Sequence, residues 1–343
     1  MLRLALERTA LKRTLALPEN LCAQLGKRLG KEDQPMLDAR LRLLLAASRS
    51  KKPLNERSLD EARNFYGEMF KLMDVEPVAS VSIREHSMHV SGDEIYLRSY
   101  HPEDAKSTAA LPGLLFMHGG GFTIGSVADY HGIVSWLADR LKMVIVSLDY
   151  RLGPEHPYPA AAEDAIAAWQ WLCANTDRLG LNPARLGVMG DSAGGNLAAV
   201  VCQQALRRGL PKPKLQCLIY PTLDLRMTAA SISRYGKGFG LTRELIKWFR
   251  SHYLGSVAQA NELLASPGLA EQVSGQPTTL MITATDPLRD EGIDYADKLR
   301  AAGVHVTHLD YPQLIHGFIG MAGVLPAAKQ ALDEMCLALS ERL

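Results

Sequence analysis

A serine flanked by glycines is the first residue in this sequence whose surroundings suggest chemistry. Ser192 lies at the centre of the run GDSAG, residues 190–194, which has the pattern G-x-S-x-G. A serine exposed at such a sharp turn takes strained backbone angles, and glycines at the flanking positions avoid crowding. From the glycine and serine content of the chain, about 0.1 occurrences of G-x-S-x-G are expected by chance. A Gly-rich turn without catalytic function is therefore the alternative interpretation. Because a predicted strand precedes the run and a predicted helix follows it, we interpret Ser192 as a nucleophile.

A second glycine-rich run, HGGGF at residues 118–122, follows a short apolar stretch directly. Three glycines leave the backbone bare, so the NH groups of Gly120 and Gly121, and also that of Gly119, could approach a substrate oxygen. The NH of Ala193, next to the serine, could donate to the same oxygen. The run lacks the Lys-Ser/Thr pair and the G-x-G-x-x-G spacing of phosphate-binding loops. It therefore predicts an oxyanion hole.

A serine hydroxyl is a weak nucleophile until a neighbouring base removes its proton. In enzymes with this kind of serine turn, an acid and then a histidine follow the serine along the chain. Among the later histidines, His252 falls in a predicted helix, and His305 and His308 fall in a predicted strand. His316 lies in a loop just past the last predicted strand, so we expect it to be the general base.

The acid that would orient this histidine is expected to be Asp286. It stands at the carboxyl end of the apolar run TTLMITAT, so it can reach the same sheet edge as Ser192 and His316. There it would hold the imidazole tautomer and stabilise the imidazolium. Asp290 is the competing acid, but a position as helix N-cap explains it. Asp310 falls inside a predicted strand.

The elements that must position these residues follow the order strand, strand and then repeated strand–helix units. From about residue 78, short runs rich in Val, Ile and Leu alternate with helical patterns, the signature of a mainly parallel sheet covered on both faces. The first two runs read as antiparallel strands with a turn at Ser91-Gly92-Asp93. Strands are expected at 78–90, 94–102, 111–118, 143–150, 184–190, 215–221, 278–285 and 304–312, and helices at 130–141, 160–175, 192–208, 290–302 and 327–343.

Two segments lie outside this alternation. Residues 1–77 have Leu and Ala at helical spacing, and residues 224–266 contain a helical pattern for which Thr242 is the expected N-cap. We expect 78–343 to form the catalytic domain, and 1–77 and the inserted 224–266 to form a helical cap over the carboxyl edge of the sheet. A membrane anchor is the alternative for 1–77, although Glu7 and Glu19 interrupt its basic face. Side chains of the insertion that could line an acyl pocket, or pack the cap, are Met227, Phe239, Trp248, Phe249 and Tyr253.

Composition and charge disfavour several classes of protein. The chain carries 38 Lys and Arg against 37 Asp and Glu, a formal charge of +1, which gives no field that would attract a nucleic-acid backbone. Five widely spaced cysteines favour reduced, mostly buried thiols over a disulfide framework. No apolar run approaches the roughly 20 residues of a spanning helix, and charges interrupt the N-terminal stretch. We expect a cytoplasmic protein with no nucleic-acid partner and no membrane span.

Taken together, the motifs resemble those of the hormone-sensitive lipase-like family of bacterial carboxylesterases. The matching runs are HGGGF at 118–122, GDSAGG at 190–195, DPLRDEG at 286–292 and HGF at 316–318, within a similarity that extends from about residue 100 to 318. The resemblance implies the α/β-hydrolase fold, an α/β architecture with a mostly parallel eight-stranded sheet flanked by helices and a helical cap. It also implies the triad Ser192, Asp286 and His316, with Gly120, Gly121 and Ala193 as oxyanion donors.

The sequence departs from the family pattern in two places. Gly153 stands where such enzymes more often have Ala. The run Thr283-Ala284-Thr285-Asp286 is one residue shorter before the acid than is usual, which could alter how Asp286 reaches the histidine.

The expected reaction is hydrolysis of a small-molecule ester by acyl transfer to Ser192 and release by water. The resemblance implies short-to-medium acyl esters and a homodimer paired through the edge strand at 304–312. No metal or organic cofactor is expected, because no H-E-x-x-H run or Cys/His cluster occurs. An amidase or lactonase with the same triad is one alternative. A non-catalytic ligand-binding protein on this fold is another, which the presence of His316 disfavours.

Overall fold

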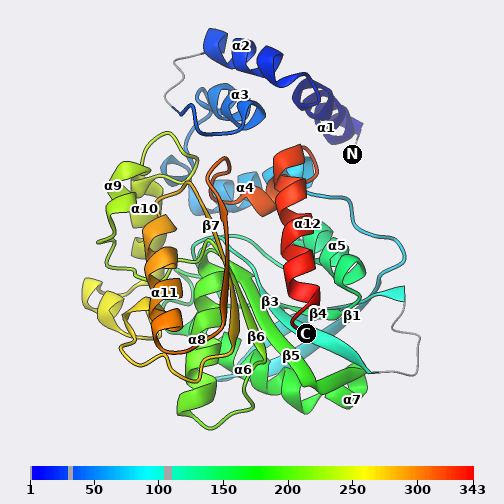
Figure 1. The fold of residues 1–343 in the computed structure, drawn as a ribbon, viewed down its shortest axis with the longest axis vertical. Helices are drawn as coiled ribbons and strands as arrows, with labels where there is room; N and C mark the ends of the chain where they lie inside the picture. Colours follow the sequence, from blue (N-terminus) through cyan, green and yellow to red (C-terminus); the bar gives the residue numbers. More distant parts are fainter. Residues whose placement is uncertain (1, 30–33, 104–109) are drawn as a thin grey trace.

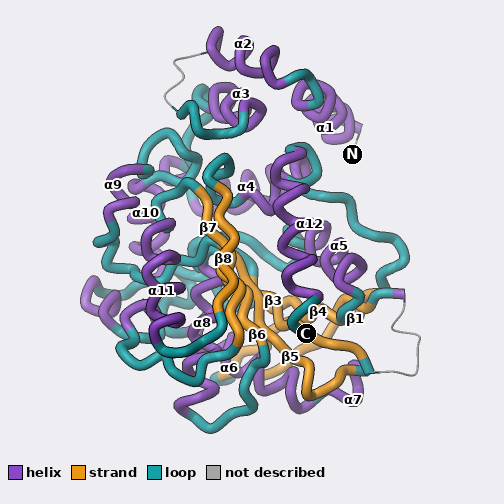
Figure 2. Tube along the Cα trace, in the orientation of Figure 1, coloured by secondary structure: helices purple, strands orange, loops and turns teal. Residues whose placement is uncertain are grey.

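The computed structural model describes residues 2–29, 34–103 and 110–343 and contains a twisted eight-stranded sheet with helices on both sides (Figures 1 and 2). The strand order is β1-β2-β4-β3-β5-β6-β7-β8. β1 pairs antiparallel with β2 and β2 antiparallel with β4, while all later neighbours are parallel. The strands are β1 (Ser82–Val90), β2 (Asp93–His101), β3 (Leu111–Met117), β4 (Val144–Asp149), β5 (Leu181–Asp191), β6 (Leu215–Ile219), β7 (Thr278–Ala284) and β8 (Val306–Tyr311).

Each face of the sheet has its own hydrophobic core, because successive strand residues point to opposite faces. In β4, Val144 and Val146 pack in one cluster of buried side chains, and Ile145 between them packs in another. The first cluster includes residues of α6 (Ala160–Ala174), α8 (Ala193–Arg207) and α11 (Arg289–Ala301). The second includes residues of α5 (His131–Leu141) and α12 (Pro326–Ser340).

The remaining helices lie mainly toward the carboxyl ends of the strands, where α1–α3 (blue) occupy the top of Figure 1. Helix α4 begins with a capping box, in which Ser58 and Glu61 each bond the other's backbone NH. Helix α10 begins at the predicted N-cap Thr242, whose side chain accepts from Leu245 NH. These helices are α1 (Leu2–Leu15), α2 (Glu19–Leu29), α3 (Ala39–Ser48), α4 (Leu59–Met73), α9 (Ala230–Arg234) and α10 (Arg243–Tyr253), with the 3₁₀ turns η1 (Leu54–Glu56), η3 (Val257–Asn261), η4 (Pro267–Leu269) and η5 (Phe318–Met321).

The structure confirms the predicted α/β architecture, a mostly parallel sheet of eight strands flanked by helices. The short helix α7 (Thr176–Leu179) was not predicted, because four residues are too few to establish a helical period. The prediction that Asp290 is a helix N-cap is wrong. Helix α11 begins at Arg289 after Leu288, and the Asp290 carboxyl instead accepts a hydrogen bond from Ser231 NH.

Two further expectations concern the cysteines and the bilayer. All five cysteines are free thiols and four are buried, which confirms the expectation from their spacing. Among the described residues, no helix has both the length and the apolar content needed to cross a membrane.

Candidate active site

Ser192 occupies the turn between β5 and α8, with a positive φ of 54°. This conformation is rare for a residue with a side chain, and the surrounding backbone enforces it. A Cβ on Gly194 would overlap the carbonyl oxygen of Met117, and one on Gly190 would overlap that of Gly194. Both glycines of the motif are therefore required by close backbone approach, as expected from the sequence.

The structure brings the three predicted triad residues together. The Oγ of Ser192 is 2.8 Å from Nε2 of His316, and Nδ1 of the same imidazole is 3.0 Å from Oδ2 of Asp286. Asp286 lies two residues after the end of β7, and His316 lies in the loop after β8, so all three reach the carboxyl edge of the sheet. The short run before Asp286 does not prevent the contact.

The Asp286 carboxyl is fully buried, whereas the His316 side chain is 13% exposed. The second carboxyl oxygen of Asp286, Oδ1, accepts a hydrogen bond of 2.7 Å from Leu288 NH. This bond fixes the carboxyl plane, and an ionised carboxylate facing Nδ1 favours the tautomer with the proton on Nδ1. In that tautomer Nε2 is free to accept the proton of the serine hydroxyl.

The glycine-rich loop after β3 turns sharply beside Ser192. Gly120 and Gly121 both have positive φ angles, 114° and 58°. A Cβ on Gly120 would overlap the carbonyl oxygen of Ile124. Within the described residues, no hydrogen bond is recorded that occupies the NH groups of Gly120 and Gly121. These two groups are available to a ligand oxygen next to the serine.

The prediction for Gly119 needs a correction. Its NH donates to Oδ1 of Asp191 at 2.7 Å and lies 3.1 Å from the hydroxyl oxygen of Tyr130. A donor already engaged by a buried carboxylate cannot also serve a substrate oxygen, so we exclude Gly119 from the candidate oxyanion donors.

Asp191, the second residue of the GDSAG run, is a buried acid that is hydrogen-bonded to the glycine-rich loop. Besides the NH of Gly119, it accepts the hydroxyls of Tyr130 and Tyr220 at 3.1 and 3.4 Å. Burial raises the pKa of its carboxyl to about 6, while His316 and these hydrogen bonds favour the charged form and act in the opposite direction. The carboxyl thus joins the nucleophile turn to the glycine-rich loop.

Helix α10 covers the glycine-rich loop from outside. The ring of Phe249 lies so close to Gly121 that a Cβ there would overlap it. Tyr253, one turn later, stacks on Phe122 with ring centroids 3.9 Å apart and planes 10° apart. The inserted segment therefore contributes directly to the shape of the loop.

Arg63 on α4 connects the N-terminal helices to the residues that follow the glycine-rich loop and to the segment around Gly153. Its Nε donates to the carbonyl of Thr123 at 3.0 Å, and its Nη2 donates to the carbonyl of Gly153 at 3.2 Å. The guanidinium also forms a bidentate ion pair with Glu155, with both N–O distances 2.7 Å. No motif marked Arg63, because its partners are 60 or more residues away in sequence.

A cavity of about 540 Å³ opens beside Ser192 and His316. Its walls come from both non-alternating segments and are mainly apolar, with Leu41 and Met69 from the N-terminal helices and Phe249 from the insertion. Of the five side chains that the sequence suggested for this wall, Phe249 and Tyr253 line the cavity. Phe239 instead packs in the core that contains α5 and α12.

The described residues contain no group of three or more His, Cys, Asp or Glu side chains arranged to hold a metal ion. The carboxyl edge of the sheet presents a hydroxyl, an imidazole, a carboxylate and backbone NH donors close together. Such a set can perform nucleophilic acyl transfer.

Comparison with known proteins shows the family to which this chain belongs. Residues 114–320 match the model of the α/β-hydrolase fold family, and the chain belongs to this family. The chain is 40% identical over 275 residues to carboxylic ester hydrolase LipN of Mycobacterium tuberculosis, covering 78% of this chain and 72% of the relative. It is 34% identical to ethyl acetate hydrolase of Pseudomonas putida, covering 90% and 99%.

Solved esterase structures agree with this assignment. A thermostable esterase from Pseudomonas putida superposes with a TM-score of 0.85 at 33% identity, covering 91% of this chain and 99% of that one. The thermophilic carboxylesterase EstE1 from a metagenomic library has a TM-score of 0.78 at 38% identity, covering 84% and 98%. Within the α/β hydrolases the chain is a member of the hormone-sensitive lipase-like group, and it is a carboxylic ester hydrolase.

Proposed function

We propose that this enzyme hydrolyses carboxylic esters through a covalent acyl-enzyme on Ser192, with His316 as general base and Asp286 as the group that orients it. The observation that carries the proposal is the continuous hydrogen-bonded chain from Ser192 Oγ through both nitrogens of His316 to the buried Asp286. Ser192 and His316 line an apolar cavity together with Gly120 and Gly121, whose backbone NH groups can receive an oxyanion.

In the first half of the reaction Ser192 Oγ attacks the ester carbonyl carbon while His316 Nε2 takes the hydroxyl proton. The carbonyl oxygen becomes an oxyanion, which the NH groups of Gly120, Gly121 and Ala193 stabilise. The C–O bond to the alcohol then breaks, and the imidazolium gives its proton to the leaving alkoxide. An acyl-serine ester and a free alcohol result.

In the second half a water molecule attacks the acyl-serine carbonyl, and His316 Nε2 takes a proton from that water. A second oxyanion forms in the same backbone site. When it collapses, the bond to Ser192 Oγ breaks and the imidazolium returns the proton to the serine. The carboxylic acid leaves, and the residues of the site return to their starting protonation states.

For substrates we propose small-molecule esters with short-to-medium acyl chains. The cavity walls are mainly hydrocarbon, so they favour an apolar acyl or alcohol group that gains free energy on leaving water. A relative that spans nearly the same length carries the name ethyl acetate hydrolase, which supports small esters. An amide or lactone would meet the same three residues, so this alternative depends on the leaving group that the cavity accepts.

We also propose that residues 1–77 and 224–266 form a cap on a catalytic domain of residues 78–343. Residues 1 and 30–33 of the first segment lie outside the described residues. The support is that Leu41, Met69 and Phe249, from these two segments, line the same cavity as Ser192. A homodimer through β8 stays a prediction, as do the absence of a nucleic-acid partner and a cytoplasmic location. β8 stands at one edge of the sheet.

A series of p-nitrophenyl esters from acetate to palmitate tests the proposed substrate class. We expect kcat/KM to peak between about four and eight acyl carbons, because each buried methylene adds about 0.8 kcal/mol until the chain exceeds the cavity. Matched p-nitroanilides of the same acids are expected to react far more slowly. A maximum at palmitate would contradict the short-to-medium assignment. Faster turnover of the anilides would favour an amidase.

A further inference from the structure

Glu291 is a buried acid close to the candidate active site that the proposed mechanism does not use. It lies in the first turn of α11, five residues after Asp286, and is only 7% exposed. Its Oε2 accepts a hydrogen bond of 2.7 Å from the backbone NH of Asp224. Burial raises the pKa of its carboxyl well above the usual range, although this hydrogen bond favours the charged form.

The partner of Glu291 belongs to the segment Thr222–Leu225, which forms part of the wall of the ester cavity. Thr222 and Leu225 both line that cavity together with Ser192. The segment also contacts the nucleophile turn, because Thr222 NH donates to the Ser192 carbonyl at 3.2 Å. A change in the position of this segment would alter the wall of the ester cavity next to Ser192.

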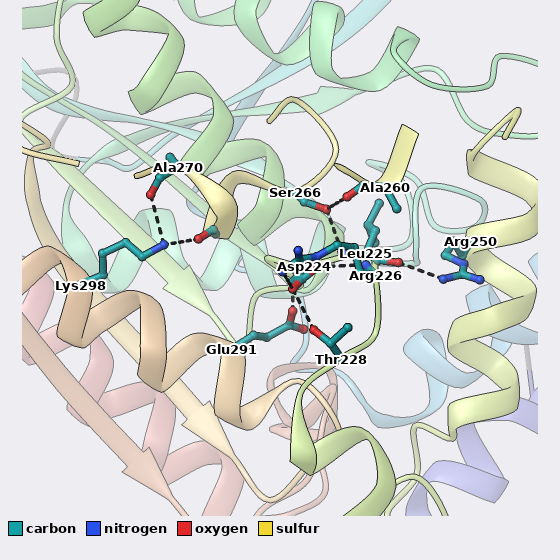
Figure 3. Close-up of polar contacts among 11 residues, drawn as sticks. Asp224, Leu225, Arg226, Thr228, Arg250, Ala260, Ser266, Ala270, Glu291 and Lys298 are labelled. Atoms are coloured by element: carbon teal, nitrogen blue, oxygen red, sulfur yellow. Dashed lines mark hydrogen bonds and ion pairs between the residues drawn. The ribbon is translucent and has the colours of Figure 1, made fainter. Parts of the chain in front are cut away.

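Three side chains converge on this wall from helix α11, from helix α10 and from the loop before η4 (Figure 3). Glu291 bonds the NH of Asp224 from α11. The hydroxyl of Ser266 accepts from Leu225 NH at 2.9 Å, and it donates to the carbonyl of Ala260 at 2.7 Å. Arg250 of α10 donates to the carbonyl of Leu225 at 3.2 Å. The wall is thus held through its backbone, which leaves the side chain of Leu225 free to face the cavity.

A role in packing alone does not explain an acid at this position. Burying a carboxyl group is costly, and an apolar side chain of similar size would fill the space without that cost. The neighbouring cation, the guanidinium of Arg226, bonds the carboxyl of Asp224 at 2.8 and 2.9 Å rather than that of Glu291. Glu291 instead contributes a carboxyl oxygen that accepts the hydrogen bond from Asp224 NH in the cavity wall.

We propose that Glu291 is a positioning residue for acyl-chain selectivity: its hydrogen bond to Asp224 NH holds Thr222–Leu225 in place as a wall of the ester cavity. The inference rests on the proposed function, because it concerns the cavity in which the ester would bind. It extends that function by assigning selectivity to a residue outside the cavity surface.

The test compares Glu291→Ala with Glu291→Gln and Asp294→Ala, using p-nitrophenyl acetate and hexanoate. Asp294 is an exposed acid one turn further along α11, so it serves as the matched control. In Glu291→Ala we expect KM for hexanoate to rise roughly 10-fold, because a two-carbon acyl group depends little on a displaced wall and a six-carbon group depends on it strongly. The ratio of kcat/KM for hexanoate to that for acetate should fall accordingly.

Glu291→Gln keeps an oxygen that can accept from Asp224 NH, so its ratio should stay within about twofold of the parent value. Asp294→Ala should leave the ratio unchanged. A purely structural role would lower the amount of active enzyme equally for both esters. Each rate is therefore expressed per active site, after titration of the serine with a phosphonate.

Ser266→Ala provides a second variant, because it releases the same wall from the opposite side without touching Glu291. It should shift the ratio in the same direction, and it decides the question if Glu291→Ala does not fold. The inference is overturned if folded Glu291→Ala has the parent ratio, if Asp294→Ala shifts it equally, or, where Glu291→Ala does not fold, if Ser266→Ala leaves it unchanged. A parent chain with no ester turnover would instead overturn the proposed function, and this inference with it.

Discussion

Replacement of Ser192 with alanine is expected to lower kcat for p-nitrophenyl butyrate by about 10⁵-fold, close to the background hydrolysis rate. The alanine retains the cavity and the backbone donors but has no atom that can form the acyl-enzyme. Because His316 Nε2 is 2.8 Å from the missing hydroxyl, the remaining base can at best activate a water molecule. The measurement is the steady-state rate of p-nitrophenolate release by purified parent and variant.

Ser251→Ala is the matched control for this experiment. Ser251 is an exposed serine of α10 whose hydroxyl donates to the nearby carbonyl of Trp248 at 2.8 Å. Its loss should leave kcat within about twofold, as expected for an exposed substitution. If Ser192→Ala were folded and retained a tenth or more of the parent activity, Ser192 would not be the nucleophile.

The second large effect concerns Asp286, and we expect Asp286→Asn to lower kcat by about 10⁴-fold. The asparagine has nearly the same shape, so the fold should persist. Its amide, however, can present a donor toward His316 Nδ1, which favours the imidazole tautomer with the proton on Nε2. In that tautomer Nε2 cannot accept the proton of Ser192. The measurement is kcat for the same ester, with the melting temperature recorded alongside.

Asp290→Asn is the informative comparison, since Asp290 is the second aspartate of the same sequence motif. Its carboxyl accepts from Ser231 NH at 2.8 Å, and an asparagine oxygen can replace that acceptor. We expect its kcat to stay within about threefold of the parent. A large loss in Asp290→Asn together with a small loss in Asp286→Asn would reassign the acid.

Much of the fold was predictable because burial on both faces leaves a strong pattern in a strand. The first three residues of β4, at 144–146, are apolar without alternation, and the structure explains why: Val146 packs in one core and Ile145 in the other. The glycine spacing around Ser192 was equally informative. Close approach of Met117 and Gly194 carbonyls excludes a Cβ at Gly194 and Gly190, so the motif follows from local geometry.

Other features depend on contacts between residues far apart in sequence, and no local pattern reveals them. Gly119 looked like an oxyanion donor because it belongs to a run of three glycines, yet its NH is engaged by Asp191, 72 residues later. Arg63 contacts Thr123 and Glu155, 60 and 92 residues away. In the sequence, Arg63 is one charged residue among others in a helical pattern. Arginines are mostly exposed, so nothing in the pattern distinguishes Arg63 from a solvent-facing side chain.

The departure from the family pattern at Gly153 has a physical reason in the structure. A Cβ at Gly153 would overlap the carbonyl oxygen of His252, near the end of α10. The NH of Gly153 also donates to the carbonyl of Phe122, in the glycine-rich loop. In this chain the end of α10 therefore approaches the backbone at residue 153 more closely than the side chain of an alanine there would permit.

The most direct test of the central claim is covalent labelling with a p-nitrophenyl alkylphosphonate, followed by peptide mass spectrometry. A nucleophilic serine attacks phosphorus and expels p-nitrophenolate, which leaves a phosphonyl group on Oγ. We predict one adduct per chain, on the peptide that contains Ser192, formed in step with loss of esterase activity and absent from Ser192→Ala. Complete inactivation with the adduct on another residue, or full activity in chains labelled at Ser192, would contradict the account.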